Sequence, residues 1–475
     1  MSDQASAYGS LDEPAARLRT RPRARIVLQN LAIIAPLFFV NAAGTPGNAL
    51  FFVILCAMAA HSSEWTVKAI SLMYLAIVGN VALVSTGGPV FGAGKFLFLM
   101  ICSLRLLYSM RLIGLSAMSH RIMLPLILFV LVAFLLAIEG GYYVYVSGLK
   151  LFAFLIGIVT VFAAIEVMRH RRHELDRWFL ALAVFILIIG VLADLAGVGY
   201  NSQTLRGFGA RFFNGPFYHS QTLGPGAALI VLYLMSYGLL TAHPDRRIAL
   251  LMIPPFLLFV YISGSRTSLL AIIMAMALAL AMLVFMRSAA LTKMTKVIRF
   301  AFLISMAAIL LGVMAELARP GILLDQIVDF MIKNESGGAI NSQTLLYSRQ
   351  VLIEMMWQNI VEQPWTGIGF GTSTDPAFVY RAGLLSAPTE KGIMPLALLE
   401  ETGIIGTAFF TLLIVAILAY SVESNNVPGL MGFAGIIGVN LAEANFFSFG
   451  GQGGFFWIWV MACFILNDAT RTRTT

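Results

Sequence analysis

The sequence predicts an all-α polytopic membrane protein. Of its 475 residues, 59% are hydrophobic and only 11% are charged, and the mean hydropathy is +0.87. A soluble domain carries roughly a quarter charged residues, so most of this chain must face lipid or other apolar helices. The apolar residues also fall into separate runs of about 20, the length of a membrane-crossing helix. The net charge of +8 therefore indicates basic cytoplasmic loops more than nucleic-acid binding.

Fourteen apolar runs are candidate spans, and we expect about 12–14 transmembrane helices. The lower number allows for two short runs and for Lys95 and Arg105, which interrupt the fourth. About eleven helices occupy residues 25–317, a large loop follows at 318–393, and about three helices occupy 394–467. In order, the runs are 25–43, 47–61, 66–86, 91–110, 122–139, 145–167, 178–199, 223–242, 247–263, 267–286, 298–317, 394–420, 428–446 and 452–467.

Lysine and arginine gather in alternate connections, such as RHRRHELDR, HPDRR and RSAALTKMTKVIR. The other connections, including NAAGTPGN, EGGYY and FFSFGGQGG, contain almost none. The positive-inside rule then predicts that both termini are cytoplasmic, with tails at 1–24 and 468–475. The basic N-terminal segment has no cleavage site of small residues, so we interpret it as a tail and not a signal peptide.

Three outer segments carry arginines although the positive-inside rule disfavours them there. This favours a functional role for these arginines at the outer face. Arg206 and Arg211 lie in the connection 197–222, and Arg266 lies in SGSR before the tenth span. The third segment is the loop 318–393. Within it, LLYSRQVLIEMMWQNIVEQ has helical periodicity, and a proline follows shortly after, so we expect a helix there.

Arg266 has two interpretations. Ser263 or Ser265 is a candidate N-cap for a helix that runs inward from Arg266. A guanidinium beside the positive end of a helix dipole, with free backbone N–H groups, makes a good phosphate site. The simpler interpretation is an arginine that anchors the helix at the membrane interface.

The other outer-face cations leave the same choice open. Arg206 and Arg211 either complete a cationic patch with Arg266 or are solvated loop charges. Arg349 either binds substrate or pairs with a nearby glutamate. His219 begins the eighth span and is either structural or a general base or phosphate donor.

Carboxylates inside apolar runs are expensive and indicate a functional site by default. Glu400 and Glu401 lie about two helical turns into the twelfth span, and Lys391 precedes that span on its outer side. Asp194 and Glu443 lie near outer ends of spans, where a structural interfacial role is the simpler interpretation.

We expect no cofactor, and an enzyme of this sequence would need no metal. GIGFGT (367–372) follows no βαβ pattern, so a glycine-rich turn is a better interpretation than a nucleotide-binding loop. The chain lacks a Walker lysine motif, a nucleophile elbow, DxD-type acid pairs and a His/Cys cluster. Cys56, Cys102 and Cys463 stand singly in apolar runs, which indicates packing.

Four segments together resemble the O-antigen ligase and polymerase family, bacterial proteins that join lipid-linked glycans at the periplasmic face. RFFNGPFYHSQTLG (211–224) is similar to a family pattern of Arg, Gly, an aromatic, His-x-Asn and Leu-Gly, with Gln221 in place of Asn. SGSRTSLLA (263–271) is similar to a Ser-x-Ser-Arg-Thr segment. SRQVLIEMMWQNIVEQPWTGIGFGT (348–372) resembles an Arg…Trp…Pro…Gly-x-Gly stretch, and LALLEETGIIG (396–406) resembles the segment after it.

One departure from the family pattern concerns the base. The family often has a His nine residues before the Glu that corresponds to Glu401, and here that position is Gly392, next to Lys391. In the ligases this His is thought to activate the acceptor hydroxyl. Its absence argues against a ligase, and Lys391, His219 or Glu401 would have to substitute. The His219 segment looks more like that of exopolysaccharide polymerases.

The resemblance implies a Wzy-type exopolysaccharide polymerase with a GT-C-like fold in the bacterial inner membrane and its active site facing the periplasm. Such a glycosyltransferase joins oligosaccharide repeat units carried on undecaprenyl diphosphate. Its partners would be the lipid-linked donor and acceptor and the bilayer, with flippase and chain-length regulator proteins as further candidates, and no nucleic acid.

The resemblance also assigns expected roles. Arg211 and Arg266 would hold the diphosphate and stabilise its charge as it leaves, and His219, Lys391 or Glu401 would supply base help. The substrate-binding group would comprise Arg206, Arg349, Trp357, Trp365 and Tyr380, with the aromatic residues stacking on sugar faces.

Two other functions remain open. A ligase would transfer a finished glycan to lipid A-core. A transporter would need charged residues and broken helices near the bilayer midplane, related by an internal repeat. The sequence shows no such repeat, and its unusual charges gather at the outer face.

Overall fold

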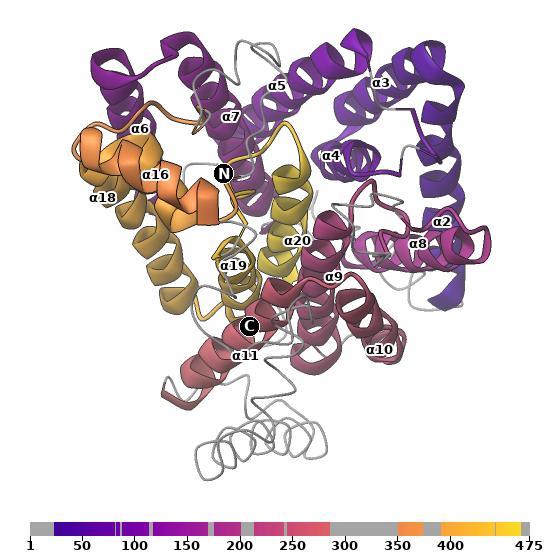
Figure 1. The fold of residues 1–475 in the computed structure, drawn as a ribbon. Coiled ribbons are helices and arrows are strands. Elements are labelled where there is room, and N and C mark those ends of the chain that lie inside the picture. The colour runs from indigo at the N-terminus through magenta and orange to yellow at the C-terminus, as the bar shows by residue number, and fades with distance from the viewer. Residues whose placement is uncertain are drawn as a thin grey trace, which may run out of the picture.

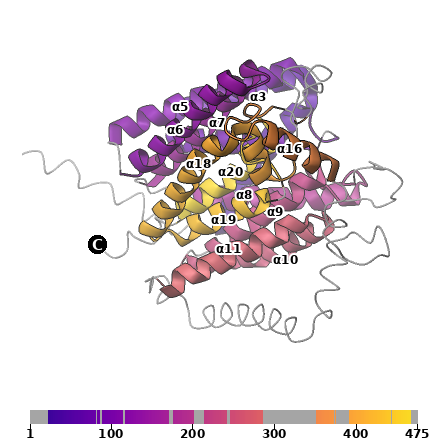
Figure 2. The same cartoon turned by 60° about the vertical axis from the view of Figure 1, so that its left-hand side comes forward.

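The computed structural model describes residues 23–80, 82–85, 88–113, 117–169, 175–200, 213–241, 245–285, 350–372, 374, 391–441 and 443–466. These residues form an almost entirely helical bundle (Figures 1 and 2). They contain no β-sheet, only the isolated bridges Gly79–Phe217 and Tyr200–Phe213. The predicted span 298–317 lies outside them.

The helices follow the predicted apolar runs closely. Up to the middle of the chain they are α2 (Arg23–Val40), η2 (Asn41–Ala43), α3 (Gly44–His61), α4 (Ser63–Ile77), α5 (Pro89–Ile113), α6 (Ala117–Gly140), α7 (Val144–Arg169) and α8 (Leu175–Leu195). Then come α9 (Ser220–Met235), its π-helical continuation η3 (Ser236–Leu240), α10 (Arg246–Ile262), α11 (Arg266–Phe285), α16 (Gln350–Glu362), α18 (Met394–Glu423), α19 (Val427–Asn440) and α20 (Gln452–Leu466).

Seven helical stretches of the described residues are long and apolar enough to cross a membrane, which confirms the polytopic membrane fold. One of them, the 37-residue stretch Arg25–His61, contains both α2 and α3, separated by η2. Three shorter apolar helices, Arg266–Met282, Val427–Asn440 and Gln452–Leu466, accompany them. The total of twelve to fourteen spans stays a prediction.

The centre of the bundle is α20, which is buried along its whole length. It packs against α9, α19, α7 and α4, and Figure 1 shows it between α6, α7 and α18 on one side and α8 and α9 on the other. The lipid-facing surface is different: α6 exposes Leu124, Ile127, Leu131, Leu135 and Ile138 at helical spacing. A helix that is apolar on all sides belongs inside, and α20 meets that description.

The predicted loop helix is confirmed where the structure describes it. It is α16, which ends at Glu362, two residues before Pro364. It lies against α18, as Figures 1 and 2 show. GIGFGT follows as an irregular turn with positive φ at each of its glycines, so the expectation of a glycine-rich turn is also confirmed.

Candidate functional site

A buried lysine joins two buried carboxylates at the start of α18. Lys391 Nζ lies 2.7 Å from Glu400 Oε2 and 3.0 Å from Glu401 Oε1. The side chains of Lys391 and Glu400 are 1% and 0% exposed. Charges so far from water are stable only when they are paired and hydrogen-bonded. We call Lys391, Glu400 and Glu401 the acid–lysine cluster. Its remaining carboxylate oxygens therefore need hydrogen-bond donors.

Helix α16 and the loop after it supply those partners. Asn359 Nδ2 donates to Glu400 Oε1 at 2.7 Å, and Thr374 Oγ1 donates to Glu400 Oε2 at 3.2 Å. The backbone N–H of Gly371 donates to Glu401 Oε2 at 2.6 Å. Each oxygen of both carboxylates thus has a partner, and the cluster fastens the predicted outer loop to the membrane helix.

The loop also fits into a break in α18. Gly403 has φ 60° and ψ −171°, which no helix contains. The break leaves backbone groups free to pair outside the helix: Ile368 N–H donates to Glu400 O at 2.8 Å, and Ile404 N–H donates to Pro364 O at 2.8 Å. Glycine is required here because a Cβ on Gly403 would collide with the backbone of Trp365.

Lys150 is a site residue that the sequence analysis missed. It lies one to two turns into α7, is partly buried, and its Nζ donates a short hydrogen bond to Gly371 O. A lysine inside an apolar run is the available signal. Its partner lies 221 residues later, so the pairing itself has no signature in the sequence.

Aromatic rings connect the docked loop to the bundle centre. Phe370 lies 5.1 Å from Phe447 between ring centroids, and Phe447 lies 5.2 Å from Phe154 of α7. Phe447 belongs to the α19–α20 connection. The same connection contains Asn445, whose Oδ1 accepts from Gln452 Nε2 at 2.6 Å. The acid–lysine cluster and the first turn of α20 are therefore on the same face of the protein, which we call the site face.

The start of α9 lies beside the starts of α11 and α20 on this face. Gln452 of α20 accepts hydrogen bonds from Thr222 and, at 3.2 Å, from Tyr218. Gly224 of α9 packs directly on the side chains of Ser263 and Ser265, which precede α11. Three helix N-termini with positive dipole ends thus lie close together, an arrangement that favours a bound anion.

Arg266 is the first residue of α11, as predicted, and is half-buried. Ser265 stands at the N-cap position, and its Oγ is 2.6 Å from Ser268 Oγ. The side chain of Arg266 therefore extends from the N-terminal end of α11, as the sequence indicated, and this end lies next to α9.

His219 is the N-cap of α9. Its Nδ1 accepts the backbone N–H of Gln221 at 3.0 Å, so Nδ1 carries no proton. In the neutral imidazole the proton is then on Nε2, which makes Nε2–H a hydrogen-bond donor. A histidine in this tautomer is suited to donate to a phosphate or hydroxyl oxygen, and less suited to act as a base.

The remaining predicted site residues divide into two groups. Trp357 and Trp365 are 58% and 62% exposed, on and just after α16. The others, Arg206, Arg211, Arg349 and Tyr380, lie outside the described residues.

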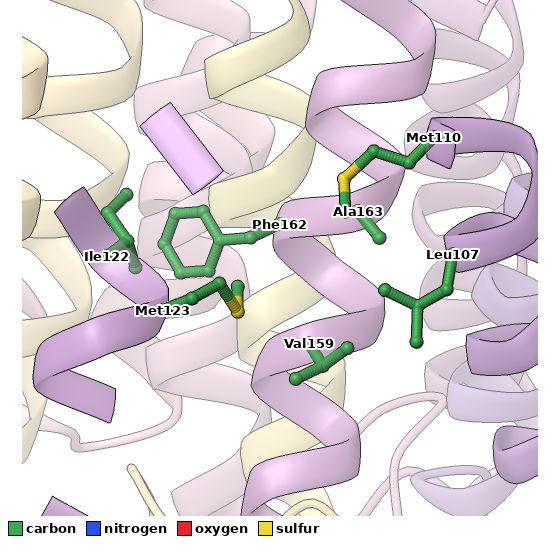
Figure 3. A pocket seen from close by; sticks show the side chains of 7 residues that line it. All are labelled: Leu107, Met110, Ile122, Met123, Val159, Phe162 and Ala163. Carbon is green, nitrogen blue, oxygen red and sulfur yellow. The ribbon is translucent and has the colours of Figure 1, made fainter. Parts of the chain in front are cut away.

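An apolar pocket elsewhere contains none of the predicted site residues. Figure 3 shows it between α5, α6 and α7, lined by Leu107, Met110, Ile122, Met123, Val159, Phe162 and Ala163. Its lining lacks charged side chains, so it offers a diphosphate no partner.

Comparison with known proteins bears on this arrangement. The family model described as O-antigen ligase matches residues 248–411. The match includes the segments 263–271, 348–372 and 396–406, which contain Arg266, the docked loop and both carboxylates of the cluster. The segment 211–224 precedes it. None of the curated proteins matches the chain.

Proposed function

This chain carries an O-antigen ligase family region at residues 248–411, and from that premise we propose that it polymerises lipid-linked oligosaccharides. The donor and acceptor are repeat units on undecaprenyl diphosphate, and the product is an exopolysaccharide. The family supports glycosyl transfer on lipid-linked glycans in general; the choice of polymerase is our proposal.

The observation that carries the proposal is the pairing of two features on the site face. One is the group of helix N-termini beside Arg266, which suits a phosphate. The other is a loop fastened to α18 through Lys391, Glu400 and Glu401. A lipid diphosphate keeps its charge at the membrane surface while its sugars extend into water, so a fixed loop beside an anion site suits it.

The proposed reaction is a displacement at the anomeric carbon of the donor. The acceptor hydroxyl oxygen forms the new C–O bond, and the bond between that carbon and the diphosphate oxygen breaks. The diphosphate leaves with the electron pair, and the acceptor proton passes to a base or to a phosphate oxygen. Arg266, with Arg211, stabilises the negative charge that develops on the leaving group.

The hydrogen bonds of the site refine the roles expected of three residues. His219 donates through Nε2–H to a phosphate or acceptor oxygen, because Nδ1 is occupied by the helix cap. Lys391 holds the loop, because its ammonium group is already bound between two carboxylates. Glu401 is in the same position, with both oxygens engaged. We therefore propose Lys391 and Glu401 as positioning residues.

Substrate binding by Arg206, Arg349 and Tyr380, and an orientation with the site face in the periplasm, complete the proposal. The positive-inside distribution of charge supports the orientation. No step requires a metal, because arginines and helix dipoles supply the positive charge at the diphosphate.

Ligation to lipid A-core is the second candidate, favoured by the name of the matching family. The absence of a histidine at Gly392 argues against it. A transporter is the third candidate, and it would move substrate without changing it.

One reconstitution distinguishes the three. Purified protein in liposomes receives the lipid-linked repeat unit, with and without lipid A-core, in the presence of a chelator. Chains longer than one unit in both samples support the polymerase. Product only when lipid A-core is present indicates a ligase, and transfer of unchanged substrate across the bilayer indicates a transporter.

A further inference from the structure

Helix α16 presents three different faces at helical spacing. Its bundle-facing residues are Leu352, Met356 and Asn359; Met356 is 0% exposed, and Asn359 binds Glu400. On either side of this face lie an apolar row and a polar row. The apolar row consists of Ile353, Trp357, Ile360 and Val361, and the polar row consists of Glu354, Gln358 and Glu362.

Half of the apolar row is exposed, and its other two residues, Ile353 and Ile360, are half-buried. Trp357 and Val361 are 58% and 63% exposed, and Trp365, just beyond the helix, is 62% exposed. A segment that faces water on all sides has no reason to expose two tryptophans and a valine together, and such patches mark a surface that is covered in the working protein.

The surface continues onto a membrane helix. The backbone of Trp365 packs on Gly403 of α18, and Pro364 O accepts from Ile404 N–H. From that point α18 exposes Ile404, Ile405, Leu412 and Val415, at 47%, 39%, 55% and 54%. Because α18 is one of the helices able to cross a membrane, this exposed stripe faces lipid.

We propose that α16 lies in the plane of the outer membrane surface, with Ile353, Trp357, Ile360 and Val361 in contact with the lipids. Trp365 sits at the same boundary. Tryptophan prefers the headgroup level of a bilayer because its ring is apolar and its N–H is polar. The row of Glu354, Gln358 and Glu362 then faces water, which is the arrangement of an interfacial helix.

This assignment differs from the sugar-stacking role expected of Trp357 and Trp365, and it does not depend on the proposed function. Its consequence concerns the depth of the acid–lysine cluster relative to the membrane. Asn359 on the bundle side of α16 binds Glu400, so a helix held at the membrane surface would hold the acid–lysine cluster at a fixed depth.

The test places a nitroxide spin label on each exposed row. Val361→Cys reports the apolar row and Glu362→Cys the polar row, the next residue along the helix and about 100° round its axis. The labelled proteins are reconstituted in phosphatidylcholine–phosphatidylglycerol bilayers without substrate. Collision rates are measured with oxygen, which concentrates in lipid, and with a nickel chelate, which stays in water. Unmodified protein gives the background from its native cysteines, which are buried or half-buried.

We expect the ratio of oxygen to nickel collisions to be several-fold higher at position 361 than at 362. Equal access of the nickel chelate to both positions would overturn the proposal, because the apolar row would then stand in water, available to a glycan. If either variant fails to fold, Trp357→Cys and Gln358→Cys form a second pair with the same expected contrast.

Discussion

Lys391 Nζ and Glu400 Oε2 form a 2.7 Å ion pair from which water is almost completely excluded. A second carboxylate, that of Glu401, shares the same ammonium group. This pairing connects the residue before α18 with residues two turns inside it, and through Asn359 and Gly371 it reaches the docked loop. Lys391, Glu400 and Glu401 thus join the docked loop to α18, and loss of the lysine should weaken this attachment.

Replacement of Lys391 by methionine should destabilise the protein strongly. Two buried carboxylates would lose their cation, and breaking a buried ion pair typically costs about 3–5 kcal/mol. Thermal unfolding in micelles should show a lowered midpoint. The double variant Lys391→Met/Glu400→Gln should recover part of the loss, because one uncompensated charge is removed. An unchanged midpoint for the single variant would refute the fastening role.

Gly403→Ala should prevent the loop from docking. A Cβ there would overlap the backbone of Trp365, and the positive φ is unfavourable for alanine, so we expect a loss of about 1–3 kcal/mol or more. Gly92→Ala in α5 is the matched control. A Cβ on Gly92 meets open space, and alanine favours a helix, so that variant should be neutral or slightly more stable. Similar unfolding midpoints for the two variants would contradict the account.

Two partly buried lysines offer a reciprocal experiment. Lys150 donates to Gly371 O, and Lys95 donates to Gly450 O at 2.5 Å. Lys150→Met should speed amide hydrogen exchange in residues 367–372, and Lys95→Met should speed it in residues 447–452. Each variant serves as the control for the other. Loosening of both segments by either substitution would show a global effect in place of two local attachments.

His219 should be replaceable as a cap but not as a donor. Asparagine caps helices well, whereas alanine at an N-cap typically costs about 1 kcal/mol. His219→Asn should therefore keep the unfolding midpoint of the wild type, and His219→Ala should lower it. Both variants should polymerise more slowly, since both lack Nε2–H. Full activity of His219→Asn would restrict His219 to a structural role.

The sequence predicted the parts of the site that depend on local pattern. Hydropathy identified the helices, SGSR identified the start of α11 at Arg266, and Pro364 identified the end of α16. The pairing of Lys391 with Glu400 and Glu401 was not predicted, although all three were candidates, because hydropathy does not show which neighbouring charges meet.

Two further features arise only from tertiary contact. Lys150 meets a loop 221 residues away, and no local pattern encodes that distance. Gly403 lies in a predicted span, and nothing in the local sequence marks its break. The hydrogen bonds that stabilise the break, from Ile404 N–H to Pro364 O and from Ile368 N–H to Glu400 O, exist only after the loop has docked.

The most direct test of the proposed function is the activity of Arg266→Ala. Arg246→Ala is the matched control, since Arg246 is likewise the first residue of its helix, α10, is likewise half-buried, and lies at the opposite end of the helix that leads to Arg266. Both proteins are checked for folding and supplied with lipid-linked repeat units. We predict that Arg266→Ala stops chain growth while Arg246→Ala continues it. Chain growth by Arg266→Ala at the wild-type rate would show that Arg266 is only a membrane anchor and would contradict the proposed diphosphate site.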